Sequence, residues 1–205
     1  GAIGNFVMGD VTGLQLASLL NVTAGDMTGF QAALGMNMAQ GAARGFQGGL
    51  LFNRAGSITG LQLAPVNVAG DVDGVQIDVV NIARNVRGAS LGLVNVADDI
   101  DGVPLAPISV TKTGGVHPAF WGGSSGFANA GVKFATRRTY TLFFGSYHEA
   151  FDRQFVGGGV AVGGRLALGA GFVTDIDVGG TYLVAPDGSL DEATDRAYHE
   201  QLVQP

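Results

Sequence analysis

The chain has 205 residues, with 35 glycines, 6 prolines and a formal net charge of −6 at pH 7. Hydrophobic residues make up 46% and charged residues 14%, a balance that excludes an intrinsically disordered chain. Cysteine is absent, which excludes disulfides, thiolate metal sites and thiol nucleophiles. The acidic balance argues against a nucleic-acid partner. No apolar run approaches the roughly 20 residues of a transmembrane helix.

The composition changes sharply near Val116. Residues 1–116 contain neither tyrosine nor tryptophan, whereas residues 117–205 hold all four tyrosines, the single tryptophan and all three histidines. We therefore predict two regions, 1–116 and 117–185, joined by a turn at Lys112-Thr113-Gly114-Gly115.

The first region is an internal repeat of 14 to 16 residues. Each unit has a glycine near its start and an asparagine at its middle, in a constant register that is typical of a repeat architecture. The glycines are Gly13, Gly29, Gly45, Gly60, Gly74, Gly88 and Gly102, and the asparagines are Asn21, Asn37, Asn53, Asn67, Asn81 and Asn95.

Within a unit, apolar residues alternate, as at Val75, Ile77 and Val79, which indicates short strands. Stacked copies would bury what one unit cannot, so we predict a β-solenoid with two short strands per coil and a length of about 34 Å. The six asparagines should form a buried, hydrogen-bonded ladder, and Gly60, Gly74, Gly88 and Gly102 should occupy tight corners. A meander of antiparallel hairpins is the alternative.

The two ends of this region suggest further expectations. Asn5–Asp10 aligns with Asn21–Asp26, so the chain begins inside a unit, and we expect a piece of a longer protein. The open first coil should be covered by upstream sequence or a neighbouring chain. At the other end, the turn at Lys112–Gly115 and the aromatic pair Phe120-Trp121 should seal the core.

The second region is predicted to form four longer strands, at Gly126–Thr136, Thr139–His148, Arg153–Leu166 and Gly171–Val184. Alternation places on one face Ala128, Ala130, Val132, Phe134, Tyr140, Leu142, Phe144, Val156, Val160, Val162, Phe172, Ile176 and Val178. The other face receives Asn129, Lys133, Thr139, Thr141, Arg165, Asp175, Asp177 and Thr181. Residues 186–205 read as a loop or short helix, beginning at the capping sequence Ser189–Glu192.

Strands of roughly ten residues, apolar on one side and polar on the other, are typical of an outer-membrane β-barrel. Aromatic residues near the strand ends agree with this. A soluble antiparallel sheet packed on a core is the alternative. Because four strands do not close such a barrel, further strands or further chains would be needed.

The iterated pattern Gly60-Leu-Gln-Leu…Val-Asn67-Val-Ala-Gly-Asp-Val-Asp-Gly74-Val-Gln-Ile…Val-Asn81-Ile-Ala resembles the Leptospira-type surface repeat-containing lipoproteins. The resemblance covers residues 5 to about 185. It implies the cell surface or outer membrane, with the repeats followed by barrel-like strands. It brings no established activity and no catalytic residues to this chain, which lacks the lipobox region of that family.

Candidate chemical motifs are few. Gly122-Gly-Ser124-Ser-Gly126 matches a hydrolase nucleophile elbow in letters, but a strand follows it where that motif requires a helix. His148, Glu149 and Asp152 read as a polar loop tip, and Asn21-Val-Thr23 is a glycosylation sequon in letters only. The paired carboxylates are interpreted as structural turn residues or as partners of nearby cations; they are Asp71/Asp73, Asp99/Asp101 and Asp175/Asp177.

These observations predict a non-enzymatic surface or outer-membrane module for structure, adhesion or assembly. No catalytic residue, cofactor or metal site is expected, and the membrane is the expected partner. The alternative is a pore or transport component in which the repeats plug or extend the barrel. A β-helical enzyme is less consistent with the short coils, which carry only Arg44, Arg54, Arg84, Arg87 and Lys112 as basic residues.

Overall fold

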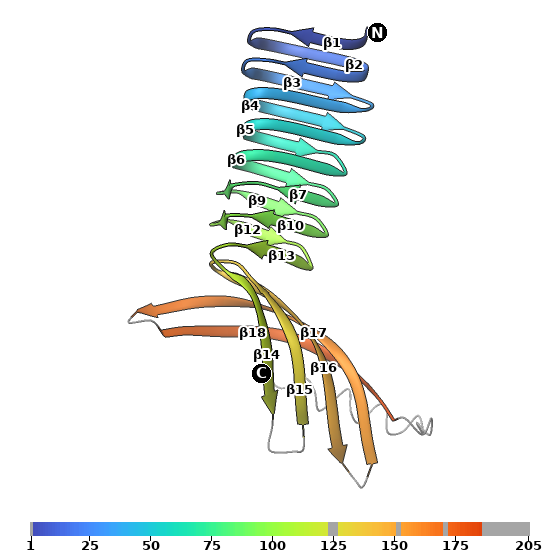
Figure 1. Ribbon diagram of the computed structural model, residues 1–205, viewed down its shortest axis with the longest axis vertical. Helices are drawn as coiled ribbons and strands as arrows, with labels where there is room; N and C mark the ends of the chain where they lie inside the picture. Colours follow the sequence, from blue (N-terminus) through green and yellow to red (C-terminus); the bar gives the residue numbers. More distant parts are fainter. Residues whose placement is uncertain (1, 123–126, 151–152, 170–171, 186–205) are drawn as a thin grey trace. The chain divides into compact units, whose positions relative to one another are not determined.

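The computed structural model describes residues 2–122, 127–150, 153–169 and 172–185. These residues form strands and turns, without a helix among them, so the predicted all-β class is confirmed (Figure 1). They fall into two compact units that divide between Gly115 and Val116. The predicted helix after Ser189 and most of the Gly122–Gly126 motif lie outside the described residues.

The strands of the first unit form one sheet that coils on itself. They are β1 (Ala2–Val7), β2 (Val11–Thr23), β3 (Met27–Ala33), β4 (Met36–Gly49), β5 (Phe52–Leu63), β6 (Val66–Ile77), β7 (Val80–Ile82), β8 (Asn85–Val86), β9 (Ala89–Leu91), β10 (Val94–Ala97), β11 (Asp99–Ile100), β12 (Val103–Leu105) and β13 (Ile108–Thr111).

Each coil of this unit lies in register on the next. Every strand pair described here is parallel and joins equivalent residues, so that Gly13 pairs with Gly29 and Asn21 with Asn37. The same register continues through β4, β5 and β6. The predicted β-solenoid is therefore confirmed, and the hairpin meander, which needs antiparallel neighbours, is excluded.

A coil has three sides rather than the two predicted. The division is clearest where each side is a separate strand, as in β7, β8 and β9, which stack on three successive parts of β6. We name each side by its characteristic residues and extend the name to the equivalent residues of every coil. The asparagine side includes β7 and β10, the polar side includes β8 and β11, and the glutamine side includes β9 and β12.

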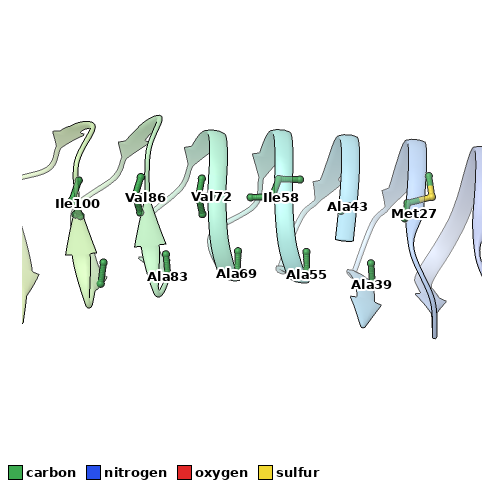
Figure 2. Close-up of a cluster of buried hydrophobic side chains, with 11 residues drawn as sticks. Met27, Ala39, Ala43, Ala55, Ile58, Ala69, Val72, Ala83, Val86 and Ile100 are labelled. Carbon is green, nitrogen blue, oxygen red and sulfur yellow. The ribbon is translucent and has the colours of Figure 1, made fainter. Parts of the chain in front are cut away.

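The apolar core is a thin column between the polar side and the asparagine side. A row of mostly larger side chains on the polar side faces a row of alanines on the asparagine side, and together they fill the narrow coil (Figure 2). The first row is Met27, Ala43, Ile58, Val72, Val86 and Ile100, and the second is Ala39, Ala55, Ala69, Ala83 and Ala97.

The repeated glycines are required for two different reasons. Gly13, Gly29, Gly45 and Gly60 have positive φ, which favours glycine. Gly74, Gly88 and Gly102 do not, so the predicted conformational role is wrong for these three. Instead, a Cβ on any of them would overlap the carbonyl oxygen of the glycine one coil earlier. Close stacking of backbone on backbone excludes a side chain there.

The second unit is an antiparallel sheet of five strands in the order of the chain. They are β14 (Gly115–Gly122), β15 (Phe127–Ala135), β16 (Thr139–Ala150), β17 (Arg153–Gly169) and β18 (Phe172–Val184). Strand β14 was not among the four predicted strands, and it contains Phe120 and Trp121. Phe120 is exposed and Trp121 packs edge-on against Phe144 of β16. That this pair seals the solenoid core stays a prediction.

The predicted faces hold for β15, β17 and β18, and the prediction for β16 is wrong. Leu142 of β16 pairs with Lys133 of β15, which places Tyr140, Leu142 and Phe144 on the polar face. Thr139, Thr141 and Phe143 lie on the apolar face instead, where Phe143 pairs with Val160. Because apolar residues occupy both alternating positions of β16, only the pairing register decides its phase.

Strand β1 is the terminal strand of the solenoid sheet. Its side chains Ile3 and Phe6 are exposed, and Asn5 continues the asparagine row. That this edge is covered by upstream sequence or by a neighbouring chain stays a prediction.

Candidate functional site

The asparagines of the repeat form a buried ladder. All six residues are at most 1% exposed, although each carries a polar amide. Asn21 Nδ2 donates to Asn37 Oδ1 at 2.9 Å, and Asn37 donates in the same way to Asn53. From Asn21 to Asn81, each amide also donates to a backbone carbonyl, such as that of Ala32 for Asn21. Both donors of these amides are therefore satisfied despite their burial.

A second ladder, which the sequence analysis did not identify, runs along the glutamine side. Gln31 Nε2 donates to Gln15 Oε1 at 2.7 Å, and Gln47, Gln62 and Gln76 continue the chain of bonds. These glutamines are also buried. The signal was present, because each of them stands two residues after a repeat glycine.

The two ladders donate in opposite directions along the stack. The bonds between asparagines run toward the C-terminal coil, as from Asn53 to Asn67, whereas the bonds between glutamines run toward the N-terminal coil, as from Gln76 to Gln62. Their amide dipoles therefore oppose each other rather than adding up along the stack.

The asparagine ladder is interrupted at Asp78. Asn67 Nδ2 donates to Asp78 Oδ2 at 2.8 Å instead of to Asn81, and no donor among the described residues reaches Asn81 Oδ1. The ladder resumes between Asn81 and Asn95. Burial raises the pKa of Asp78 to about 7, although the hydrogen bond from Asn67 acts in the opposite direction.

The outer surface of the polar side carries ion pairs between neighbouring coils. Asp26 pairs with Arg44 at 2.9 Å, and the exposed pairs Asp73–Arg87 and Asp98–Lys112 repeat this arrangement. Asp71 accepts a hydrogen bond from Asn85, and Asp99 accepts one from Thr113. Asp71, Asp73 and Asp99 thus join neighbouring coils as structural residues. Such exposed pairs contribute little stability each.

The outer surfaces of the other two sides are apolar. The glutamine side exposes Leu14, Leu16, Phe30, Leu63, Ile77, Val103 and Leu105. The asparagine side exposes Phe6, Met36, Ile82 and Val96. The corner between these sides exposes Leu19, Leu34, Leu50, Leu51, Val79 and Leu93. A hollow of about 450 Å³ on the glutamine side lies over Ala32 and Gly48, between Leu16 and Leu63.

The second unit carries a cluster of charged side chains on its polar face. Asp175 of β18 binds both Lys133 of β15 and Arg165 of β17, the latter at 3.1 Å. Tyr140 donates a hydrogen bond to Asp177, and the ammonium of Lys133 lies 3.7 Å from the centre of the Tyr140 ring. The opposite face is apolar and exposed, with Val160, Val162, Leu166, Ile176, Val178 and Tyr182.

The other candidate residues do not form a reactive site in the described part of the chain. His148 is buried and faces Phe155, whereas the adjacent Glu149 is exposed, and Asp152 is not among the described residues. No group of three or more potential ligands that could hold a metal ion occurs among the residues described. Asn21 of the sequon is fully buried in the ladder.

Neither protein-family models nor curated proteins nor solved structures match the chain. Among the described residues, no helix is long and apolar enough to cross a membrane.

Proposed function

We propose that the chain is a non-enzymatic structural module of a bacterial cell surface or outer membrane, held at the membrane by its five-stranded sheet. The observation that carries this proposal is the apolar face of the sheet. Val178 and Ile176 on β18 are 77% and 63% exposed, while the opposite face holds the charged cluster around Asp175. Monomeric soluble proteins rarely leave an apolar face of this extent uncovered.

The strand pattern and the repeat support the same proposal. In outer-membrane strands, apolar residues face lipid and alternate with polar residues that face inward. The alternation Val160, Val162 and Ile176, Val178 follows this rule, with Arg165 and Asp175 on the other face. The resemblance of the repeat to surface lipoproteins points to the same location. The solenoid would then serve adhesion or assembly.

The test places a single indole on either face of the sheet in a Trp121→Phe background. With phosphatidylcholine vesicles, Val178→Trp should shift its emission to the blue and float with the lipid. Thr181→Trp, on the opposite face of the same strand, is the matched control and should keep the emission of a less apolar site. Equal emission from both variants, or a protein that does not float, would contradict the proposal.

A pore is the second candidate, favoured by the cluster of Lys133, Arg165, Asp175 and Asp177 on one face. In the described residues β14 and β18 are the edge strands, so a pore would require further strands or further copies. Reconstitution in planar bilayers separates the two functions. A structural module should stay electrically silent, whereas discrete conductance steps that change with Lys133→Met would establish a pore.

A further inference from the structure

The solenoid segregates its outward side chains by chemistry along its whole length. On the polar side, the outward positions next to the buried core row are almost entirely polar or charged, as in the Thr59–Asp73 and Arg44–Asp26 neighbourhoods. Among the described residues, no outward position of the glutamine side is charged, and on the asparagine side Arg54 is the one exception. An arginine can extend its head toward a polar boundary while its stem stays on apolar surface.

The interior satisfies most of its own polar groups. The coils bond to one another through parallel backbone ladders, and the two amide ladders pair most of the buried amide side chains. The glutamine and asparagine sides therefore expose apolar side chains without exposing unpaired backbone groups. Hydrocarbon imposes this condition on a protein surface.

The extent of the apolar surface identifies what covers it. A side about five residues wide and seven coils long spans roughly 550 Å², so the two apolar sides together span roughly 1,100 Å². A stable protein interface buries about 800 Å² on each partner, which is more than the roughly 550 Å² of one side. A second copy or another protein on one side would also leave the other apolar side in water. Acyl chains can cover both sides and the corner between them at once.

We infer that the solenoid lies in the surface of a lipid bilayer, with the glutamine and asparagine sides and their shared corner among the acyl chains and the polar side toward water. It is the β-solenoid counterpart of an interfacial amphipathic helix. This inference rests on the proposed membrane association and adds to it a second, independent lipid contact.

The experiment uses the full chain in the Trp121→Phe background with one new indole per variant. Phe30→Trp reports on the glutamine side, Met36→Trp on the asparagine side and Thr59→Trp on the polar side. Val178→Trp reports on the sheet. Each protein is mixed with phosphatidylcholine vesicles and with vesicles of phosphatidylcholine brominated on its acyl chains, because bromine quenches nearby indoles. Circular dichroism checks that each variant keeps its strand content.

Both Phe30→Trp and Met36→Trp should lose most of their fluorescence in the brominated vesicles, and Thr59→Trp should lose little. Quenching of Val178→Trp alone would overturn the inference and leave the proposed function intact, whereas quenching of neither unit would overturn both. Quenching on one solenoid side only would contradict immersion of the corner. Concentration-dependent dimers without lipid, with blue-shifted emission from Phe30→Trp, would assign this surface to a second copy.

Discussion

Buried amide side chains occupy part of this interior, where most proteins place aliphatic side chains. A buried amide without partners is costly, and here the cost is avoided because each coil supplies the partner of the next. Asn37 shows this most fully, since it accepts from Asn21 and donates to both Asn53 and the carbonyl of Gly48. The ladder is therefore cooperative along the stack.

Replacing Asn37 by leucine should destabilise the solenoid by about 1–3 kcal/mol for each group left unpaired, since Asn21 loses an acceptor and Asn53 a donor. The exposed Arg54→Ala variant is the control and should stay within about 0.5 kcal/mol of the parent. Urea titrations followed by circular dichroism give both values. Equal losses would mean that the ladder does not contribute to stability.

Asp78 should make the stability of the solenoid depend on pH. Its pKa is raised from 3.8 to about 7, so the folded state holds this proton more tightly than the unfolded state. The stability associated with the protonated group is present below the unfolded pKa and is lost as the pH rises through about 7.

Asp78→Ala copies the residue of the preceding coil, Ala64, and frees Asn67 to donate to Asn81. The variant should be more stable than the parent at about pH 8, and the difference should shrink at about pH 5, where Asp78 is mostly protonated. Denaturation midpoints at both pH values measure this. A gain that is the same at both would exclude the carboxyl group as its cause.

At the scale of the coil, the glycines separate two constraints that usually occur together. One is a positive φ, and the other is close stacking of backbone on backbone. Gly13 has a positive φ and open space around its hydrogen, whereas Gly74 lacks the positive φ and lies against the carbonyl of Gly60. Gly9 has neither constraint.

The three alanine variants should therefore differ in a fixed order. Gly74→Ala should destabilise most, because backbone of two coils must separate; Gly13→Ala should cost about 1–2 kcal/mol from its left-handed conformation. Gly9→Ala should be close to neutral. Thermal unfolding of the full chain ranks them. If Gly13→Ala proved the more damaging, conformation rather than stacking would dominate at the repeat glycines.

At the scale of the whole molecule, both units expose apolar side chains, but the arrangement that places these side chains outside differs between them. In the sheet, alternation along β17 and β18 sends apolar residues to one face and the charged cluster to the other. In the solenoid, the polar amides turn inward and the apolar residues outward on two of three sides. Both arrangements reverse the usual pattern of a water-soluble domain, and both fit a lipid surface.

The repeat spacing predicted the solenoid, because in a parallel stack residues one repeat apart become neighbours, but only the observed parallel pairing excluded the hairpin meander. For the same reason it placed the asparagines in one buried row, and the four alternating segments of the second unit were visible in the same way. Only the tertiary structure decided the third side of the coil, the phase of β16 and the strand at Phe120. It also decided the break at Asp78 and the two roles of the glycines. These features depend on which atoms meet across strands, and that contact is set by pairing register and backbone distance rather than by any pattern along the chain.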